Sequence, residues 1–327
     1  MPSEFDAIAL TRLPRVGELA VSPDGRWLAV AVARLDADDA AYVSDLWRVP
    51  LDGGAPVALT RGGSHDRAPR FRRDGALGFL SNRNPRDGAP ADGDDARAQV
   101  WILPAEGGEP RPLTDEPLGV TDFQFAAAAD RLVVLAEVAP EVALDAMRGH
   151  VAAIAKHGPS ALRYRETPLR HWDHWLPATA LHAIGYDERG GGRVDLTPDA
   201  RHHLRNGPGD PGLAVAPDGA RIAVTWCELG ADRIHDSWLR VIDVASGVAR
   251  DLGRAAAVQH GAPRFAPDGR TLAAERTLRR RGLGEVVRLW AWQVDVEADV
   301  AGREVAAWDA IPHLQAWTGD GRGLLVT

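Results

Sequence analysis

Cysteine is almost absent from this chain of 327 residues, because Cys227 is the only one. No intrachain disulfide can form, so the sequence contains nothing that requires an oxidising compartment. Cys227 follows the run Ile222-Ala223-Val224-Thr225-Trp226, which has the composition of a β-strand. We therefore predict a buried, unreactive thiol rather than a nucleophile.

Lysine and long apolar segments are also scarce. The formal net charge is −8, and Lys156 is the only lysine, which disfavours a nucleic-acid-binding scaffold. No window approaches the roughly 18 uninterrupted apolar residues of a membrane span. Residues 1–13 lack the charged and apolar segments of a secretory signal. We expect a cytoplasmic protein that binds neither nucleic acid nor membrane.

Recognisable catalytic motifs are missing as well. No serine has glycine at both flanking positions of a G-x-S-x-G nucleophile elbow, and the sequence contains neither a glycine-rich phosphate loop nor an HExxH helix. The acidic stretches at 36–39 and 87–95 lack the ligand spacing and the closing glutamate of a calcium loop. The sequence thus predicts no catalytic residue, no metal site and no cofactor within these residues.

What the chain does contain is a repeated hairpin, first seen at residues 19–30. Pro23 sets the φ angle that a type I turn requires, Asp24 can hydrogen-bond the nearby backbone, and Gly25 takes a left-handed conformation. Before the turn, Leu19 and Val21 alternate with small or polar residues, as in a strand with one buried face. Further turns of this type centre on Asp74, Asp218, Asp268 and Asp320, and a degenerate copy of the turn centres on Ala128.

The spacing of these turns predicts the fold class. The six positions are 50, 54, 90, 50 and 52 residues apart, and a period near fifty with strand-turn-strand content is typical of a β-propeller. Most units also contain a strand with tryptophan, followed by a glycine turn and a last strand that ends in Leu59-Thr60, Leu113-Thr114 and Leu196-Thr197 in the first three units and in Asp251-Leu252 in the fourth. We predict an all-β propeller whose blades are four-stranded antiparallel sheets.

The 90-residue interval indicates an insertion in the third blade, at about residues 139–178. Its first part predicts a helix, because Leu144, Met147, Val151 and Ile154 recur at helical spacing before Gly158-Pro159. Its second part is a hexapeptide of alternating polar and aromatic character, Arg170-His171-Trp172-Asp173-His174-Trp175.

The hexapeptide has more than one interpretation. His171 and His174 flank Asp173 and could ligate a metal, but further ligands are not evident, and we favour a hydrogen-bonded polar cluster. Polar groups and tryptophan on an insertion also suit a recognition surface. The candidate substrate-binding residues are therefore Arg170, His171, Trp172, Asp173 and Trp175.

These motifs resemble a known family. The turns of the Ser-Pro-Asp-Gly type, with Asp45-Leu46-Trp47, Asp52-Gly53-Gly54, Leu59-Thr60 and Phe79-Leu80-Ser81-Asn82-Arg83, resemble the N-terminal propeller of the prolyl oligopeptidase family. The hexapeptide looks like a segment found mid-propeller in the branch of dipeptidyl-peptidase V and the acylaminoacyl peptidases. The resemblance covers essentially the whole chain, although proteins of the TolB type share the hairpin repeats.

The resemblance implies a two-part serine peptidase, in which a seven-bladed propeller caps an α/β-hydrolase domain with a Ser-Asp-His triad. The propeller there filters substrates by size and helps to bind the N-terminal part of the peptide. Residues 1–327 correspond to about five blades and the first hairpin of a sixth, without the hydrolase half, so no catalytic residue is carried over. We expect an incomplete propeller domain, in a fragment or a truncated gene product, whose partners are peptide substrates and its own α/β-hydrolase domain.

Two rival functions stay open at this point. A TolB-like or WD40-like interaction scaffold would bind a protein partner without enzymatic activity. A self-contained propeller enzyme, such as a metal-dependent lactonase, would need a ring of carboxylates that the sequence does not reveal. Because an incomplete ring cannot close, we also expect self-association and exposed apolar residues in the last blade, namely Leu289, Trp290, Leu324 and Leu325.

Overall fold

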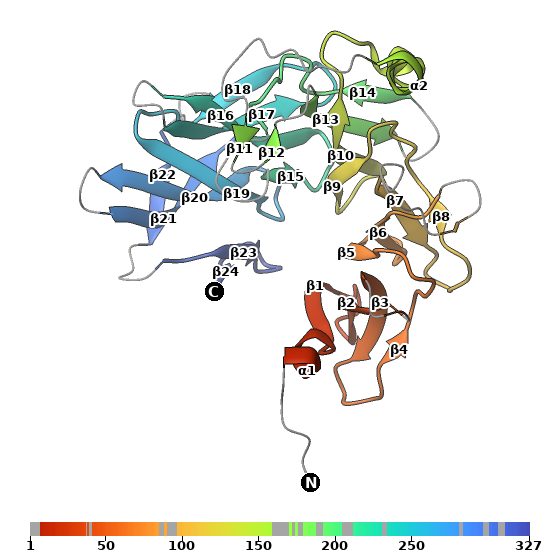
Figure 1. The fold of residues 1–327 in the computed structure, drawn as a ribbon. Helices are drawn as coiled ribbons and strands as arrows, with labels where there is room; N and C mark the ends of the chain where they lie inside the picture. The colour runs from red at the N-terminus through yellow and green to blue at the C-terminus, as the bar shows by residue number, and fades with distance from the viewer. Residues whose placement is uncertain are drawn as a thin grey trace. The chain divides into compact units, whose positions relative to one another are not determined.

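The chain forms two compact units, residues 1–122 and 123–327. A computed structural model describes residues 7–36, 38, 41–84, 88–89, 97–158, 170–171, 174–175, 179–187, 192–204, 212–230, 234–280, 284–296, 301–306 and 311–327. Each unit is built from antiparallel sheets whose strands follow one another in the chain (Figure 1).

The first unit contains two four-stranded sheets after the short helix α1 (Ala7–Thr11). The first sheet consists of β1 (Arg15–Val21), β2 (Trp27–Leu35), β3 (Tyr42–Pro50) and β4 (Val57–Ala58). The second sheet consists of β5 (Arg67–Phe71), β6 (Leu77–Ser81), β7 (Gln99–Leu103) and β8 (Arg111–Pro112). Every neighbouring pair is antiparallel, as predicted for a propeller blade.

The second unit contains three further four-stranded sheets and a hairpin in the residues that the structure describes. The third sheet consists of β9 (Val120–Phe125), β10 (Arg131–Val138), β13 (Ala180–Asp187) and β14 (Arg193–Asp195). The fourth consists of β15 (Leu213–Val215), β16 (Arg221–Leu229), β17 (His235–Asp243) and β18 (Ala249–Leu252). The fifth consists of β19 (Val258–Phe265), β20 (Thr271–Arg280), β21 (Gly284–Gln293) and β22 (Arg303–Ala306), and the hairpin of β23 (Leu314–Trp317) and β24 (Leu324–Val326).

The repeated turn has the predicted chemistry. Between β1 and β2, Gly25 has a φ of +67°, and the carboxylate of Asp24 accepts a hydrogen bond from the N–H of Arg26 at 3.1 Å. The same aspartate-to-backbone bond recurs in four other turns, at Asp74, Asp218, Asp268 and Asp320. Local side-chain chemistry alone therefore fixes these turns, which is why the sequence reveals them.

The Leu-Thr motif also has a structural role that repeats. The threonine hydroxyl at the end of the fourth strand accepts the backbone N–H of a third-strand residue at 2.9 Å in three sheets. The pairs are Thr60 with Leu46, Thr114 with Val100, and Thr197 with Ala183. Each bond fastens a short outer strand to the sheet where the backbone ladder ends.

The hydrophobic core lies between consecutive sheets of each unit. In the first unit Leu46, Phe79 and Trp101 belong to one cluster. In the second unit Trp226 and Trp238 fill the space between the third and fourth sheets, and separate clusters join the fourth sheet to the fifth and the fifth to the hairpin. A fully buried side chain of this size contributes about 1.5–3 kcal/mol of transfer free energy, so the cores between the sheets hold each unit together.

The solvent exposure of several apolar side chains near both ends of the described chain differs from the sequence prediction. Leu19 and Val21 on the first strand, β1, are 54 % and 56 % exposed. Leu325 is exposed as expected, but the prediction for Leu289 is wrong. Its side chain is fully buried, because Leu314 and Trp317 of β23 and Leu324 of β24 pack against it.

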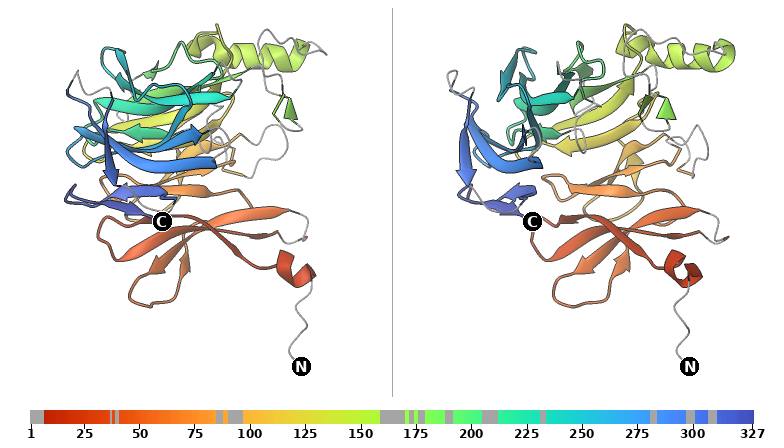
Figure 2. Two further views of the ribbon diagram at one scale, coloured as in Figure 1. Left: turned by 90° about the vertical axis from the view of Figure 1, so that its left-hand side faces the viewer. Right: turned by 60° about the vertical axis from the view of Figure 1, so that its left-hand side comes forward.

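The insertion in the third sheet begins as predicted. The short 3-10 turn η2 (Leu144–Ala146) leads into α2 (Met147–His157), which runs outward from the sheet in yellow-green in Figure 2. The helix ends at Gly158, where a Cβ atom would lie 2.3 Å from the carbonyl oxygen of Ile154. The hexapeptide contributes two very short antiparallel strands, β11 (Arg170–His171) and β12 (His174–Trp175).

Candidate functional site

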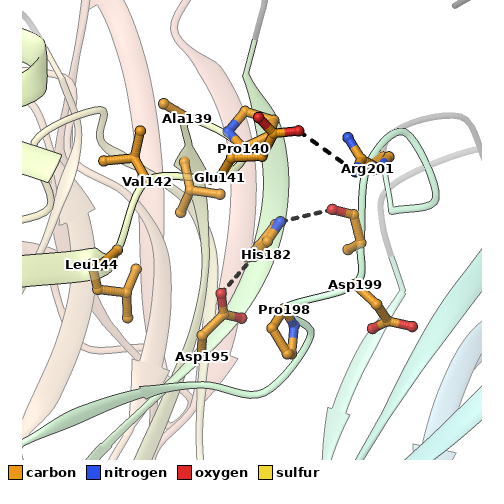
Figure 3. A pocket seen from close by; sticks show the side chains of 13 residues that line it. Ala139, Pro140, Glu141, Val142, Leu144, His182, Asp195, Pro198, Asp199 and Arg201 are labelled. Carbon is orange, nitrogen blue, oxygen red and sulfur yellow. Dashed lines mark hydrogen bonds and ion pairs between the residues drawn. The ribbon is translucent and has the colours of Figure 1, made fainter. Parts of the chain in front are cut away.

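A cavity of about 550 Å³ lies in the second unit, at the point where the insertion leaves β10. Figure 3 shows that three segments converge on it: the beginning of the insertion, the strand β13 and the loop that follows β14. Its lining consists of Val138, Ala139, Pro140, Glu141, Val142, Ala143, Leu144, His182, Asp195, Pro198, Asp199, Ala200 and Arg201.

The wall that the insertion provides is anchored on both sides. Met147 is fully buried, and its sulfur accepts the N–H of Ala139 at 3.4 Å. The guanidinium of Arg193 on β14 donates to the carbonyl oxygen of Leu144. Between these anchors Glu141 has a φ of +68°, a left-handed conformation that costs a residue with a side chain about 1–3 kcal/mol. The packing around Glu141 thus holds a strained backbone at the cavity.

A buried histidine, His182, forms the floor of the cavity. The Nδ1 atom of His182 lies 2.7 Å from a carboxylate oxygen of Asp195, and its Nε2 atom lies 2.9 Å from the carbonyl oxygen of Ala200. The second carboxylate oxygen of Asp195 accepts the N–H of Thr197 at 3.0 Å. His182 therefore connects β13 to the end of β14 and to the loop at Ala200, and neither ring nitrogen is available to a ligand.

Two carboxylates at the cavity remain accessible. The side chains of Glu141 and Asp199 are 67 % and 69 % exposed, and each faces an arginine. Glu141 lies 4.0 Å from Arg201, and Asp199 lies 3.2 Å from Arg240. Exposed ion pairs of this kind contribute only about 0–1 kcal/mol, so a ligand with a stronger hydrogen bond can replace them.

The loop from Pro198 to His203 is positioned by aromatic contacts with the fourth sheet. His203 stacks on Trp226 with ring centres 4.3 Å apart, and its Nδ1 accepts the N–H of Arg201 at 3.1 Å. Burial lowers the pKa of His203, which favours the neutral ring that can accept this bond. Arg240 lies over the same tryptophan at 3.8 Å and is held by Asp251 at 2.7 and 3.0 Å.

The described part of the cavity contains a histidine and an aspartate in contact but no nucleophilic side chain. The pair of His182 and Asp195 has the spacing of a catalytic dyad, but none of the described lining residues is a serine, threonine or cysteine. Cys227 is buried on β16, and burial raises the pKa of its thiol to about 12, as expected for an unreactive cysteine. Among the described residues, no group of His, Cys, Asp and Glu is placed to hold a metal ion, and no helix is long and apolar enough to cross a membrane.

The candidate residues from the sequence lie elsewhere in the insertion. Arg170 and His171 are on β11 and Trp175 is on β12, where Arg170 pairs with Trp175, while Trp172 and Asp173 lie outside the described residues. None of the five belongs to the described lining of the cavity. The side chains of the hexapeptide also lie outside the described part, so its role in substrate binding stays a prediction.

Sequence reasoning missed the residues of the cavity itself. Glu141 lies just before the predicted helix, and no motif surrounds Glu141, His182 or Asp199 in the sequence. One signal was present: Asp195 directly precedes the third Leu-Thr motif, whereas the corresponding residues of the first two motifs are Ala58 and Pro112. A charged residue at this position distinguishes the third sheet from the first two, although the fourth sheet has Asp251 at the corresponding position.

The chain is similar in sequence to bacterial peptidases, although no protein-family profile matches it. It is 28% identical to the uncharacterized peptidase YuxL of Bacillus subtilis over 137 residues, which cover 42% of this chain and 19% of that protein. It is 25% identical to dipeptidyl-peptidase 5 of Porphyromonas endodontalis over 272 residues, which cover 80% of this chain and 37% of that protein. The chain thus spans well under half the length of these relatives.

Solved structures share the fold at low sequence identity. An acylaminoacyl peptidase in complex with Z-Gly-Gly-Phe-chloromethyl ketone matches 95% of this chain with a TM-score of 0.64 and 10% identity, over 42% of its own length. The β-propeller domain of the trilobed protease from Pyrococcus furiosus matches 93% with a TM-score of 0.55 and 9% identity, over 76% of its own length. These likenesses show that the four-stranded sheets belong to a β-propeller fold. Since the sequence relatives are peptidases and the fold is that of peptidase propellers, the chain fits a propeller of the prolyl oligopeptidase family.

Proposed function

We propose that this chain is the propeller part of a serine peptidase and that it admits and orients short peptides for an α/β-hydrolase domain outside residues 1–327. The peptidase relatives and the peptidase propellers support the general assignment. In this proposal the propeller contributes recognition, and the hydrolase domain contributes the nucleophile and its activating base.

The observation that carries the proposal is the charge of the cavity at the insertion. Its described lining holds three carboxylates, those of Glu141, Asp195 and Asp199, and one guanidinium, that of Arg201. Asp195 is engaged by His182, so Glu141 and Asp199 are the two acceptors that a ligand can reach. A free peptide N-terminus is a cation with several hydrogen-bond donors, and it fits such acceptors.

The insertion supplies a second element to the proposal. The β11–β12 hairpin carries the candidate residues Arg170, His171, Trp172, Asp173 and Trp175. We assign to it a contact with the body of the peptide, because aromatic and polar side chains on a loop are well suited to that task.

The chemical test is peptide binding to the 327-residue chain, measured by calorimetry. A tetrapeptide with a free N-terminus is compared with its N-acetylated form, and the chain is compared with its Glu141→Gln and Asp199→Asn variants. Each variant removes a charge without a change of shape. We expect each variant to bind the free peptide about tenfold more weakly than the wild-type chain does, equivalent to about 1.4 kcal/mol. Each variant should bind the acetylated peptide with unchanged affinity. Asp145→Asn is the matched control, because Asp145 is an exposed acid of the same insertion outside the described lining.

The hexapeptide is tested in parallel with the double variant His171→Ala and Asp173→Ala. Weaker peptide binding at an unchanged melting temperature supports the proposed contact. A lower melting temperature with unchanged affinity assigns the hexapeptide to packing. If the wild-type chain binds neither form of the tetrapeptide, the proposal fails, and the interaction-scaffold interpretation takes its place.

We also place the protein in the cytoplasm. The support is its cysteine content. Cys227 is the only cysteine of the 327 residues, and it is buried, so these residues form no disulfide bond that would require an oxidising environment.

A further inference from the structure

The cavity at the insertion has two walls of different chemistry. Residues 138–144 form one wall, and Glu141 is the only charged residue among them. The other wall comes from β13, β14 and the loop that follows, and it holds the remaining charged groups of the described lining. Figure 3 shows Val142 and Leu144 on one side and Asp199 and Arg201 on the other. A ligand in the cavity therefore meets an apolar surface and a charged surface at the same time.

The apolar wall offers side chains, because hydrogen bonds within the protein already engage several of its backbone groups. The N–H of Val142 donates to the carbonyl oxygen of Ala139 at 3.2 Å, and the carbonyl oxygen of Leu144 accepts the guanidinium of Arg193. The side chains of Val142 and Leu144 are only partly buried. Apolar surface that stays in contact with water in this way is available to an apolar ligand group.

This wall is also fixed in place before any ligand arrives. Met147 is fully buried directly after it, and Arg193 holds it to β14. Burying an apolar group against a preformed surface costs little ordering of the protein, so most of the gain from burial appears as affinity.

The charged wall disfavours acidic ligand groups. Within the described lining, Arg201 is the only cation, and it lies 4.0 Å from the carboxylate of Glu141. An acidic group that approached Arg201 would therefore meet a like charge beside it. Cationic groups, by contrast, find the accessible carboxylates of Glu141 and Asp199.

The first residue of a peptide has the chemistry that both walls require. Its ammonium group and its side chain leave the same Cα atom in different directions, so one can face the carboxylates while the other faces Val142 and Leu144. Internal residues of a peptide have no ammonium group at Cα. The cavity volume of about 550 Å³ lies within the range of sites that enclose small ligands, so it can hold a bulky first residue.

We propose that the wall of residues 138–144 selects peptides whose first residue has an apolar side chain, and that Val142 and Leu144 determine this specificity. The selection rests on the proposed function, because the ammonium group must bind Glu141 and Asp199 for the side chain to reach the wall. A glycine leaves the wall in contact with water. A polar side chain of the same shape as leucine loses its hydration without gaining a partner, and an acidic one is repelled as well.

The first arm of the test uses the wild-type chain and four tetrapeptides, Leu-Ala-Ala-Ala and its relatives with Gly, Asn or Asp as the first residue. Leucine, asparagine and aspartate have nearly the same shape, so they differ mainly in polarity and charge. Calorimetry measures the affinity of each free peptide and of its N-acetylated form. We expect the free leucine peptide to bind about tenfold more tightly than the free glycine and asparagine peptides, and the aspartate peptide to bind most weakly.

The second arm changes the wall. Val142→Thr and Leu144→Asn keep the shape of each side chain and make it polar. Each should reduce the preference for leucine over glycine to about threefold, with unchanged affinity for the glycine peptide, which has no side chain to reach the wall. Val151→Thr is the matched control, because Val151 is a partly buried valine of the same insertion outside the described lining. Melting temperatures verify that the variants fold, and the wild-type series decides the matter if one does not.

The outcomes separate the selection from the function on which it rests. Equal affinities of the free leucine, glycine and asparagine peptides overturn the selection and leave the proposed function standing. The selection is also overturned if both wall variants retain the full preference for leucine, or if Val151→Thr reduces it equally. If no peptide binds, or if acetylation has no effect on any of them, the proposed function fails and the selection fails with it.

Discussion

His260 on β19 is fully buried, and its burial determines its chemistry. Its Nδ1 lies 3.1 Å from the carbonyl oxygen of Ser237, and its ring meets the edge of Trp292 with the ring centres 5.4 Å apart. Burial lowers the pKa of His260 to about 4. The same ring explains a break in the repeat: Gly253 replaces the threonine of the Leu-Thr motif, and a Cβ there would lie 2.8 Å from the imidazole.

The pH dependence of the free energy of unfolding follows from the protonation of His260 in the folded and the unfolded chain. The unfolded chain binds a proton at His260 below pH 6.5, while the folded chain keeps the ring neutral down to about pH 4. The free energy of unfolding therefore falls as the pH drops through this window, by about 3 kcal/mol for the full shift. We expect His260→Asn to be less stable at pH 7 and to lose less stability between pH 7 and pH 4.5 than the wild type, as measured by urea denaturation.

His157→Asn provides the control for this experiment, because His157 is exposed at the end of α2. Its stability profile should follow that of the wild type. An unchanged loss of stability in His260→Asn between the two pH values would show that other groups cause the acid sensitivity.

At the scale of the element, one threonine side chain holds the fourth strand in each of the first three sheets. β8 has only two residues, and the hydroxyl of Thr114 just beyond it accepts the N–H of Val100 at 2.9 Å and donates to Gln99 at 2.8 Å. Both partners are buried. A valine at this position keeps the shape but leaves the buried N–H of Val100 without its partner, and it removes one of the two hydrogen bonds that Gln99 Oε1 accepts, the other coming from the N–H of Glu116.

We expect Thr114→Val to lower the free energy of unfolding by about 1–3 kcal/mol, the cost of orphaned buried polar groups. Thr197→Val should behave alike in the second unit, since Thr197 makes the same bond to Ala183. Thr277→Val is the matched control on β20, because its hydroxyl makes no hydrogen bond with the described residues. Thermal and urea denaturation measure the effect, and equal stability of all three variants would contradict the role that we assign to the motif.

The elements also show how far local sequence determines structure. The turns at Asp24 and Gly25 were predictable because their chemistry is contained within five residues. The exposure of Leu19 and the burial of Leu289 were not, because each depends on which strand lies alongside. The cavity of Glu141, His182 and Asp199 joins segments that are far apart in the chain, and strand alternation does not tell which loops converge. The two-residue strands β11 and β12 are too short for any periodic signal.

For the whole molecule, the repeat alone predicted an all-β propeller of four-stranded sheets, because its period is independent of any single contact. Function could not be derived in the same way, since function resides in sites rather than in the fold. The likeness to peptidases therefore says little about catalysis by residues 1–327. The described lining of the cavity lacks a nucleophilic side chain, although it contains a histidine and an aspartate 2.7 Å apart.

We accordingly expect the purified 327-residue chain to remain unlabelled by a fluorophosphonate probe, because a serine reacts only when a base and an oxyanion site activate it. Intact-mass spectrometry after incubation measures the outcome, with a known serine peptidase as the positive control. A one-to-one adduct would contradict the division of labour that we propose, and peptide mapping would then identify the serine.

The solitary lysine has a practical consequence for spectroscopy. Lys156 is exposed on the last turn of α2, in the insertion that forms one wall of the cavity. Apart from the α-amino group, it is the only primary amine in the 327 residues. An amine-reactive dye therefore labels only these two amines. Once the molecules labelled at the N-terminus have been removed, the dye marks Lys156 alone. A fluorophore there can follow the insertion in real time while ligands are added, without any engineered cysteine.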